Sequence, residues 1–304
     1  MLLAAAALAL GLLLLAAVVP PRLACAAWPV RAPSYALVLW QVLGLVGGVL
    51  AVEVAVTVAL APVGATHSLA LGALLDGATL PWWSVAALVV GAAVLGRLVW
   101  VLVRSAAGTL RERHAHRVLV DLVATRNPLL AGTRVVDHDL PLAYCLPGLR
   151  PRVVLSRGVL DLLREDEVRA VLAHESAHVE QRHDLVVLPF VALGATFPRL
   201  PAVRTAQAQV ALLVEMLADD RAARRHPPPV LARALCKVGA AQVPGGGLGG
   251  GLGVSASADG VLLRASRLVT PPAPLGRAGR ALVVLAAGLV LLVPVLGVLL
   301  PALA

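Results

Sequence analysis

Four long apolar runs constrain the fold of this 304-residue sequence more than any other feature. They cover about residues 2–19, 35–61, 82–103 and 281–304. At about 1.5 Å per residue, a helix of about 20 residues crosses the apolar layer of a bilayer. The sequence therefore predicts four transmembrane helices. A cleavable signal peptide needs basic residues before its apolar core, and none precedes Leu2, so we expect the first span to be retained.

The placement of arginine predicts how these spans cross the cell membrane. Arg22 and Arg31 lie between the first two spans. The 62–81 loop contains no Lys or Arg, whereas the 104–184 stretch is rich in Arg. Loops with an excess of these residues stay in the cytoplasm. We therefore expect a multi-pass protein of the cell membrane, with a cytoplasmic region between the third and fourth spans and both termini outside.

The charged residues gather in that region, an insert of residues 104–280. Over the whole chain 59% of residues are hydrophobic and only 14% are charged, against about 25% charged residues in soluble domains. The insert is therefore the part of the chain in which polar chemistry is expected.

Composition also argues against two other classes of protein. The net charge of +9 could indicate nucleic-acid binding, but the basic residues lie beside apolar spans, and aromatic residues, which stack on bases, are only 3%. We therefore expect no nucleic-acid partner. Cys25, Cys145 and Cys236 are far apart, so the sequence encodes neither a disulfide framework nor a thiolate zinc site.

The first half of the insert predicts a helix, a small sheet and a second helix. We expect an Arg-rich helix over 105–125. Three short β-leaning runs, at 133–137, 142–145 and 152–156, are separated by Pro, Gly and Asp and predict a small β-meander. Acidic residues at 165–167 suit the positive end of a helix dipole, so the next helix is expected to begin there.

The second half of the insert predicts another helix and a linker. The apolar run 185–197 is short for a span and is expected not to cross the membrane. A helix is expected over 203–225, since the prolines at 227–229 end it. The Gly-rich stretch within 244–260 lacks the Lys-Ser/Thr ending of a phosphate loop and predicts a flexible linker.

The pattern with the clearest chemistry is His174-Glu175-Ser176-Ala177-His178, an H-E-x-x-H sequence on an expected helix. Residues four apart share one helix face, so both imidazoles can reach one metal ion. Glu175 is one step round the helix from His174 and is placed to act as a general base on a water molecule.

A catalytic zinc ion normally has three protein ligands, so a third ligand is expected elsewhere. The remaining histidines are scattered, at 67, 114, 116, 138, 183 and 226. Glu215 is the better candidate, with Asp219 one turn later on the same helix face to support a ligand histidine. A solvated acidic face is the alternative interpretation, but both acids lie in an apolar run in which an unpaired carboxylate is costly.

These residues resemble a known family. The motif at 174–178, followed by the helix with Glu215-x-x-Ala-Asp219, resembles the BlaR/MecR-type membrane zinc peptidases, family fifty-six of the metallopeptidases. The stretches 151–160 and 167–173 also look like that family and, more distantly, like HtpX-type peptidases. The layout of the whole chain is similar, but the resemblance is specific only over about 130–225.

The resemblance implies that His174, His178 and Glu215 bind one zinc ion and that Glu175 activates water. It also implies that the strand at 152–156 pairs with an extended substrate backbone. The residue that stabilises the oxyanion stays open, since Tyr144, Arg221 and His226 are not ranked by the sequence.

Two departures from the family limit what it implies. Relatives often carry Asp nine residues after the first ligand, where this chain has His183, followed by Asp184. We therefore transfer no role to His183 and expect a surface residue at the helix end. Antibiotic-sensing members carry an extracellular penicillin-binding module after the fourth span, whereas this sequence stops at Ala304, so direct β-lactam sensing is not expected.

The sequence thus predicts a mainly α protein with four transmembrane helices and a cytoplasmic α+β zincin-like insert. The expected function is that of a membrane-integral zinc endopeptidase acting on a cytosolic or membrane-adjacent protein, such as a transcriptional repressor by family analogy. Its expected partners are a protein or peptide substrate, the lipid bilayer and a separate regulator or sensor protein. The alternative is a non-catalytic membrane signalling or scaffold protein with a structural or vestigial zinc site, against which the intact Glu175 argues.

Overall fold

The computed structural model describes residues 1–126, 133–146, 152–241 and 258–303. Most of the expected linker at 244–260 lies outside these residues. Inter-residue contacts divide the chain into two compact units. The first unit comprises Met1–Val103, Ala192–Ala206 and Leu275–Ala304, and the second comprises Arg104–Val191 and Gln207–Pro274.

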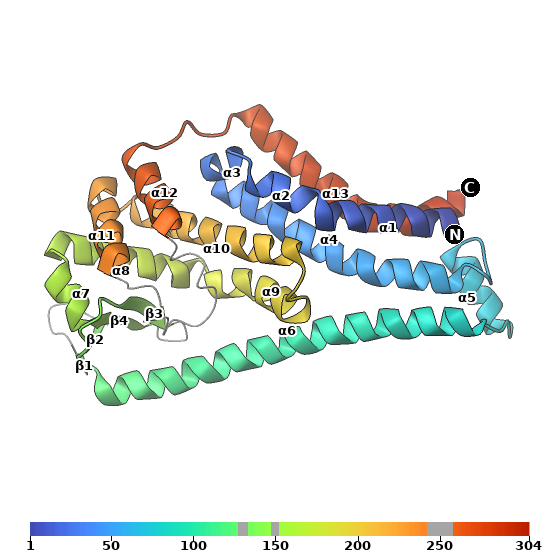
Figure 1. Ribbon diagram of the computed structural model, residues 1–304, viewed down its shortest axis with the longest axis horizontal. Helices are drawn as coiled ribbons and strands as arrows, with labels where there is room; N and C mark the ends of the chain where they lie inside the picture. The colour runs from blue at the N-terminus through green and yellow to red at the C-terminus, as the bar shows by residue number, and fades with distance from the viewer. Residues whose placement is uncertain (127–132, 147–151, 242–257, 304) are drawn as a thin grey trace. The chain divides into compact units, whose positions relative to one another are not determined.

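The first unit is built around three long apolar helices, α1 (Leu2–Ala17), α4 (Pro33–Leu60) and α13 (Arg277–Leu303), which lie side by side in Figure 1. Leu8 and Leu50 are buried where they meet. Shorter helices complete the N-terminal part: α2 (Val19–Ala24), α3 (Trp28–Arg31) and α5 (His67–Leu75).

Within the described residues, four helical segments are long and apolar enough to cross a membrane, as the sequence predicts. They are Leu2–Ala24, Pro33–Leu60, Trp82–Arg111 and Arg277–Leu299. The third belongs to α6 (Trp82–Val123), which continues without a break through the Arg-rich helix expected over 105–125.

The second unit contains a four-stranded sheet, and its topology corrects the expected meander. The strands are β1 (Thr125–Arg126), β2 (Thr133–Val136), β3 (Ala143–Leu146) and β4 (Arg152–Ser156), in the order β1-β2-β4-β3. A meander would place β3 between β2 and β4, whereas β4 lies between β2 and β3 and runs parallel to β2. Since β4 is already paired on both sides, the expected pairing of 152–156 with a substrate backbone is also wrong. The edge strands are β1 and β3.

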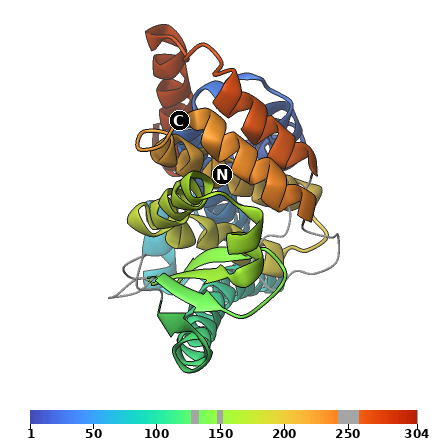
Figure 2. The ribbon, with the colours of Figure 1, turned by 90° about the vertical axis from the view of Figure 1, so that its left-hand side faces the viewer.

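Between the sheet and α13, the described residues form six helices. They are α7 (Arg157–Leu162), α8 (Glu165–Glu180), α9 (His183–Thr196), α10 (Pro201–Ala222), α11 (Pro228–Ala241) and α12 (Ala258–Val269). In Figure 2 helices of this unit, yellow-green to orange, lie over the green strands.

Helix α8 lies in the middle of the hydrophobic core of this unit. Val168 and Val171 pack with Leu155 of β4 and with Ala234 of α11. On another side of α8, Ala170 packs in a cluster with residues of α10, α11 and α12. The helix that carries the H-E-x-x-H pattern is therefore held from several directions by apolar contacts.

A tight turn separates α8 from α9. Gln181 ends α8, and Arg182 takes a φ of 50° in the left-handed region, which non-glycine residues rarely adopt. The helix therefore breaks at this position, and α9 begins at His183. Helix α9 is apolar but shorter than a span, in keeping with the expectation for 185–197.

Candidate metal centre

Helix α8 places His174 and His178 one turn apart. Their Nε2 atoms lie 3.2 Å from each other. His174 is almost fully buried, and the side chain of His178 is 23% exposed. The two imidazoles therefore converge on one point at the edge of the core.

Helix α10 brings Glu215 to the same point. Its Oε2 lies 3.4 Å from Nε2 of His174, and its Oε1 lies 3.6 Å from Nε2 of His178. One ligand atom from each of the three residues lies within 4.8 Å of the others. The structure thus brings together the three residues predicted as metal ligands.

The spacing of these atoms fits a zinc ion. Donor atoms about 2.0–2.1 Å from a tetrahedral zinc ion lie about 3.3–3.4 Å from one another. The observed separations of 3.2, 3.4 and 3.6 Å fall around that value. Two histidines and a carboxylate are also the ligand types found at catalytic zinc sites.

Each ligand histidine has a partner on its other ring nitrogen. Nδ1 of His174 lies 2.9 Å from Oδ1 of Asp219, which is 1% exposed. Nδ1 of His178 lies 3.0 Å from Nδ1 of His183. Such contacts fix the orientation of an imidazole, so that Nε2 of each ring is the atom turned toward the other ligands.

The position of His183 corrects a prediction. We expected a surface residue at a helix end, but His183 is only 4% exposed. The left-handed residue Arg182 separates the two helices, and the ring of His183 packs edge-on against His178. The pattern of the sequence did not reveal this turn, because arginine is not a residue that favours positive φ.

Arg264 of α12 is a residue of the site that sequence reasoning missed. Its guanidinium donates two hydrogen bonds of 2.8 Å to the two carboxylate oxygens of Asp219. Its Nη1 lies 2.9 Å from Oε2 of Glu215. The signal was available, because Arg264 lies among Val261, Leu262 and Leu263, where an arginine needs an anionic partner.

The buried charges shift the pKa values of these groups. Burial opposes the charged form of His174, but the Asp219 and Glu215 carboxylates outweigh it and raise the pKa of His174 to about 10. Burial lowers the pKa of His178 to about 3. Burial also disfavours the Glu215 carboxylate, but the hydrogen bond with His174 and the charge of Arg264 hold the pKa of Glu215 well below its ordinary value. At neutral pH, Glu215 and His178 thus have the protonation states that metal ligands need, whereas His174 carries a proton that a metal ion would have to displace.

The predicted base, Glu175, follows His174 on α8, and its charge acts on Arg264. The residues left open as oxyanion donors are placed differently. Arg221 donates hydrogen bonds of 3.0 and 2.9 Å to Glu180. Tyr144 packs against Val154 of the sheet.

Comparison with known proteins points to the same class of site. Residues 109–223 match the profile of Peptidase family M48, a stretch that contains the predicted ligands and base. A protein described as "Protease HtpX homolog" from Aeropyrum pernix is 42% identical over 72 residues. That alignment covers 23% of this chain and 23% of the relative. No solved structure matches the chain.

The fold and the site together define a membrane-associated chain with a metallopeptidase-like region. Of the two resemblances seen in the sequence, the comparisons support the HtpX-type. The BlaR/MecR-type resemblance stays a prediction.

Proposed function

We propose that this chain is a membrane-integral, zinc-dependent endopeptidase. The observation that carries the proposal is the convergence of His174, His178 and Glu215, with donor separations that suit a tetrahedral zinc ion, directly beside Glu175. The match to Peptidase family M48 over 109–223 supports the same activity.

The residues of the site would have different roles in peptide hydrolysis. A bound zinc ion supplies a Lewis acid that polarises the scissile carbonyl and activates a water molecule. Glu175 accepts the proton of the attacking water and later delivers it to the leaving amine. Asp219, whose Oδ1 lies 2.9 Å from Nδ1 of His174, would keep Nε2 of that ring directed at the metal once metal binding has displaced its proton.

The substrate class follows from the membrane spans. The distribution of arginine predicts that the insert between the third and fourth spans is cytoplasmic, so we propose a cytosolic or membrane-adjacent protein substrate. A regulatory protein such as a transcriptional repressor fits this position, as in the BlaR/MecR-type peptidases. A separate regulator or sensor protein completes such a system.

Replacement of the base tests the proposal. Glu175→Gln keeps the size of the side chain and removes its basicity, so we expect hydrolysis to fall by about 10²–10⁴-fold with zinc still bound. Newly formed protein N-termini in cells bearing either form, and the zinc content of each purified protein, give the two readouts. Glu180→Gln is the matched control, because Glu180 lies on the same helix and pairs on the surface with Arg221.

Two results would contradict the proposal. Equal cleavage by the parent and by Glu175→Gln would remove the assigned role of Glu175. Zinc bound at full occupancy, with no cleavage product in any comparison, would instead favour the alternative of a membrane scaffold or signalling protein with a structural zinc site.

A further inference from the structure

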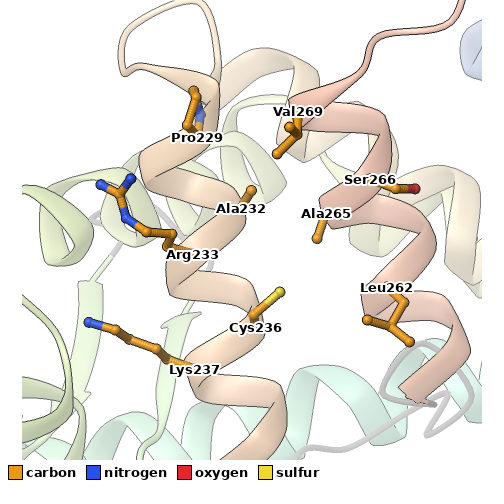
Figure 3. A pocket seen from close by; sticks show the side chains of 9 residues that line it. All are labelled: Pro229, Ala232, Arg233, Cys236, Lys237, Leu262, Ala265, Ser266 and Val269. Atoms are coloured by element: carbon orange, nitrogen blue, oxygen red, sulfur yellow. The ribbon is translucent and has the colours of Figure 1, made fainter.

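Helix α12 presents two different faces to its neighbours. Figure 3 shows Leu262, Ala265 and Val269 on the side that lines a pocket with Cys236 and other residues of α11. Arg264 does not line that pocket and contacts α10 instead. The site therefore receives a contribution from α12, besides those of α8, α9 and α10.

Arg264 contacts two carboxylates of the site: Glu215, which is a predicted ligand, and Asp219, which supports a ligand histidine. Three of its nitrogens lie 2.8–2.9 Å from oxygens of Asp219 and Glu215. Arg264 is 5% exposed and Asp219 is 1% exposed, so water cannot replace these contacts. A guanidinium is a planar fork, and its position fixes both carboxylates at once.

The contacts form a chain that ends at the ligand atoms. Arg264 orients Asp219, whose Oδ1 lies 2.9 Å from Nδ1 of His174. Arg264 also binds Oε2 of Glu215, while Oε1 of Glu215 lies 3.6 Å from His178. Loss of the guanidinium would leave a buried carboxylate without its main partner, and such a group rotates away or takes up a proton.

We propose that Arg264 is a positioning residue of the metal centre, which holds Glu215 and Asp219 in the arrangement that binds zinc. The inference rests on the proposed function, because it assumes that the three ligands bind a metal. It concerns zinc affinity and not hydrolysis, so it can be tested apart from peptidase activity.

An opposing effect must be weighed. The guanidinium is positive and repels a nearby metal ion, so charge alone predicts that its removal tightens zinc binding. Orientation predicts the reverse, since loss of a residue that orients metal ligands typically costs about 10–100-fold in affinity. We expect orientation to dominate, because Arg264 makes three short contacts with carboxylates that have little access to water.

The chain offers a matched control in the same pair of helices. Arg267 of α12 binds both carboxylate oxygens of Asp220 in α10, with one distance of 2.9 Å. This pair joins α12 to α10 as the Arg264–Asp219 pair does, but Asp220 is not in contact with a predicted ligand. Arg267→Met therefore weakens the attachment of α12 without disturbing Asp219 or Glu215.

The experiment measures the zinc dissociation constant of the full-length chain in detergent, by competition with a chelator. We expect Arg264→Met to weaken zinc binding by about 10–100-fold and Arg267→Met to change it by less than about twofold. Arg264→Lys keeps the positive charge but lacks the planar guanidinium. The metal-free Arg264→Lys protein should therefore melt at the temperature of the parent, whereas its zinc affinity should stay below that of the parent. If Arg264→Met fails to fold, the zinc affinity of Arg264→Lys alone tests the positioning role. This variant should bind zinc at least about tenfold more weakly than the parent.

Several results would overturn the proposal. Unchanged or tighter zinc binding by Arg264→Met would show that orientation is not its role, and so would equal losses in the Arg264 and Arg267 variants. A parent chain that binds no zinc would also refute it. A parent chain that binds zinc and cleaves nothing would refute the peptidase function and leave the role of Arg264 intact.

Discussion

In the candidate centre, the Nδ1 atom of each ligand histidine contacts a different kind of group. His174 contacts a carboxylate, Asp219, whereas His178 contacts a second imidazole, His183. Both partners are buried, at 1% and 4% exposed. The two imidazoles are therefore oriented by the protein before any ligand is present, which reduces the entropy lost on metal binding.

The contact between His183 and His178 leads to a testable expectation. His183→Leu removes the partner of His178 Nδ1, leaves that ring free to rotate and should weaken zinc binding by about tenfold. His138→Leu is the control, since His138 is an exposed histidine of the loop after β2. The zinc affinity of each variant, measured by competition with a chelator, tests this expectation. An unchanged affinity for His183→Leu would mean that packing alone orients His178.

The sequence was informative about residues with a fixed spacing. His174 and His178 are one helical turn apart, so a local pattern predicts that their side chains share a face, with Glu175 one step round the helix. His183 and Arg264 could not be placed in that way. The first depends on the left-handed turn at Arg182, and the second comes from a helix that lies 45 residues beyond its partner Asp219.

At the scale of one element, the start of α8 is stabilised by Glu167. The backbone N–H of Arg164 donates a hydrogen bond of 2.9 Å to its carboxylate, and Nζ of Lys237 in α11 donates one of 2.6 Å. Burial alone raises the pKa of Glu167, but these hydrogen bonds, with the charges of Lys237 and Arg233, hold the pKa below its ordinary value. The ionised carboxylate therefore joins the helix that carries the motif to α11.

This shift predicts how stability depends on pH. A carboxyl group whose pKa is lowered by folding stabilises the protein above its unfolded pKa, and that contribution disappears as the pH falls through the folded pKa. Glu167→Gln should lower the stability of the metal-free protein by about 1 kcal/mol at pH 7, a value reduced because Lys237 is partly exposed. The difference from the parent should begin to shrink as the pH falls below about 4.3, the ordinary pKa of Glu, and should disappear as the pH falls through the lower pKa of the folded protein.

Thermal melting over a pH series, with chelator present, measures this difference. Glu165→Gln is the control, because Glu165 occupies the same first turn but has an 80% exposed side chain. A constant difference between parent and Glu167→Gln from pH 7 to pH 3 would contradict the assigned ionisation.

The elements themselves were predicted unevenly. Helix α8 and helix α10 were expected close to their observed bounds, because acidic residues mark the start of one and prolines follow the end of the other. The order of the strands was wrong. The meander assumed that consecutive strands are neighbours, whereas the hydrogen bonds of β4 with β2 are parallel pairings that no local pattern encodes.

At the scale of the whole molecule, the four apolar segments and the distribution of arginine predict a topology that can be measured. Cys25 and Cys236 are both exposed, and both are expected on the cytoplasmic side. Residue 78 lies in the loop expected outside, and Ala78 is exposed. A membrane-impermeant maleimide added to intact cells should therefore label Ala78→Cys and not the two native cysteines.

The comparison uses variants that carry Cys145→Ser and keep a single cysteine, at position 25, 78 or 236. After the membrane is permeabilised, Cys25 and Cys236 should label as well, which shows that they are reactive. Labelling of Cys236 in intact cells would reverse the predicted orientation and place the candidate centre outside the cytoplasm.

The contact between Arg264 and Asp219 joins residues 45 positions apart, and translation therefore makes them at different times. A ribosome adds about 5–20 residues per second, so a nascent chain contains both acids roughly 2–9 s before it contains the guanidinium that neutralises them. With the proposed role of Arg264, a growing polypeptide carries an immature centre of low metal affinity until α12 has been synthesised. With the proposed function, the chain would therefore gain peptidase activity only after α12 has been made.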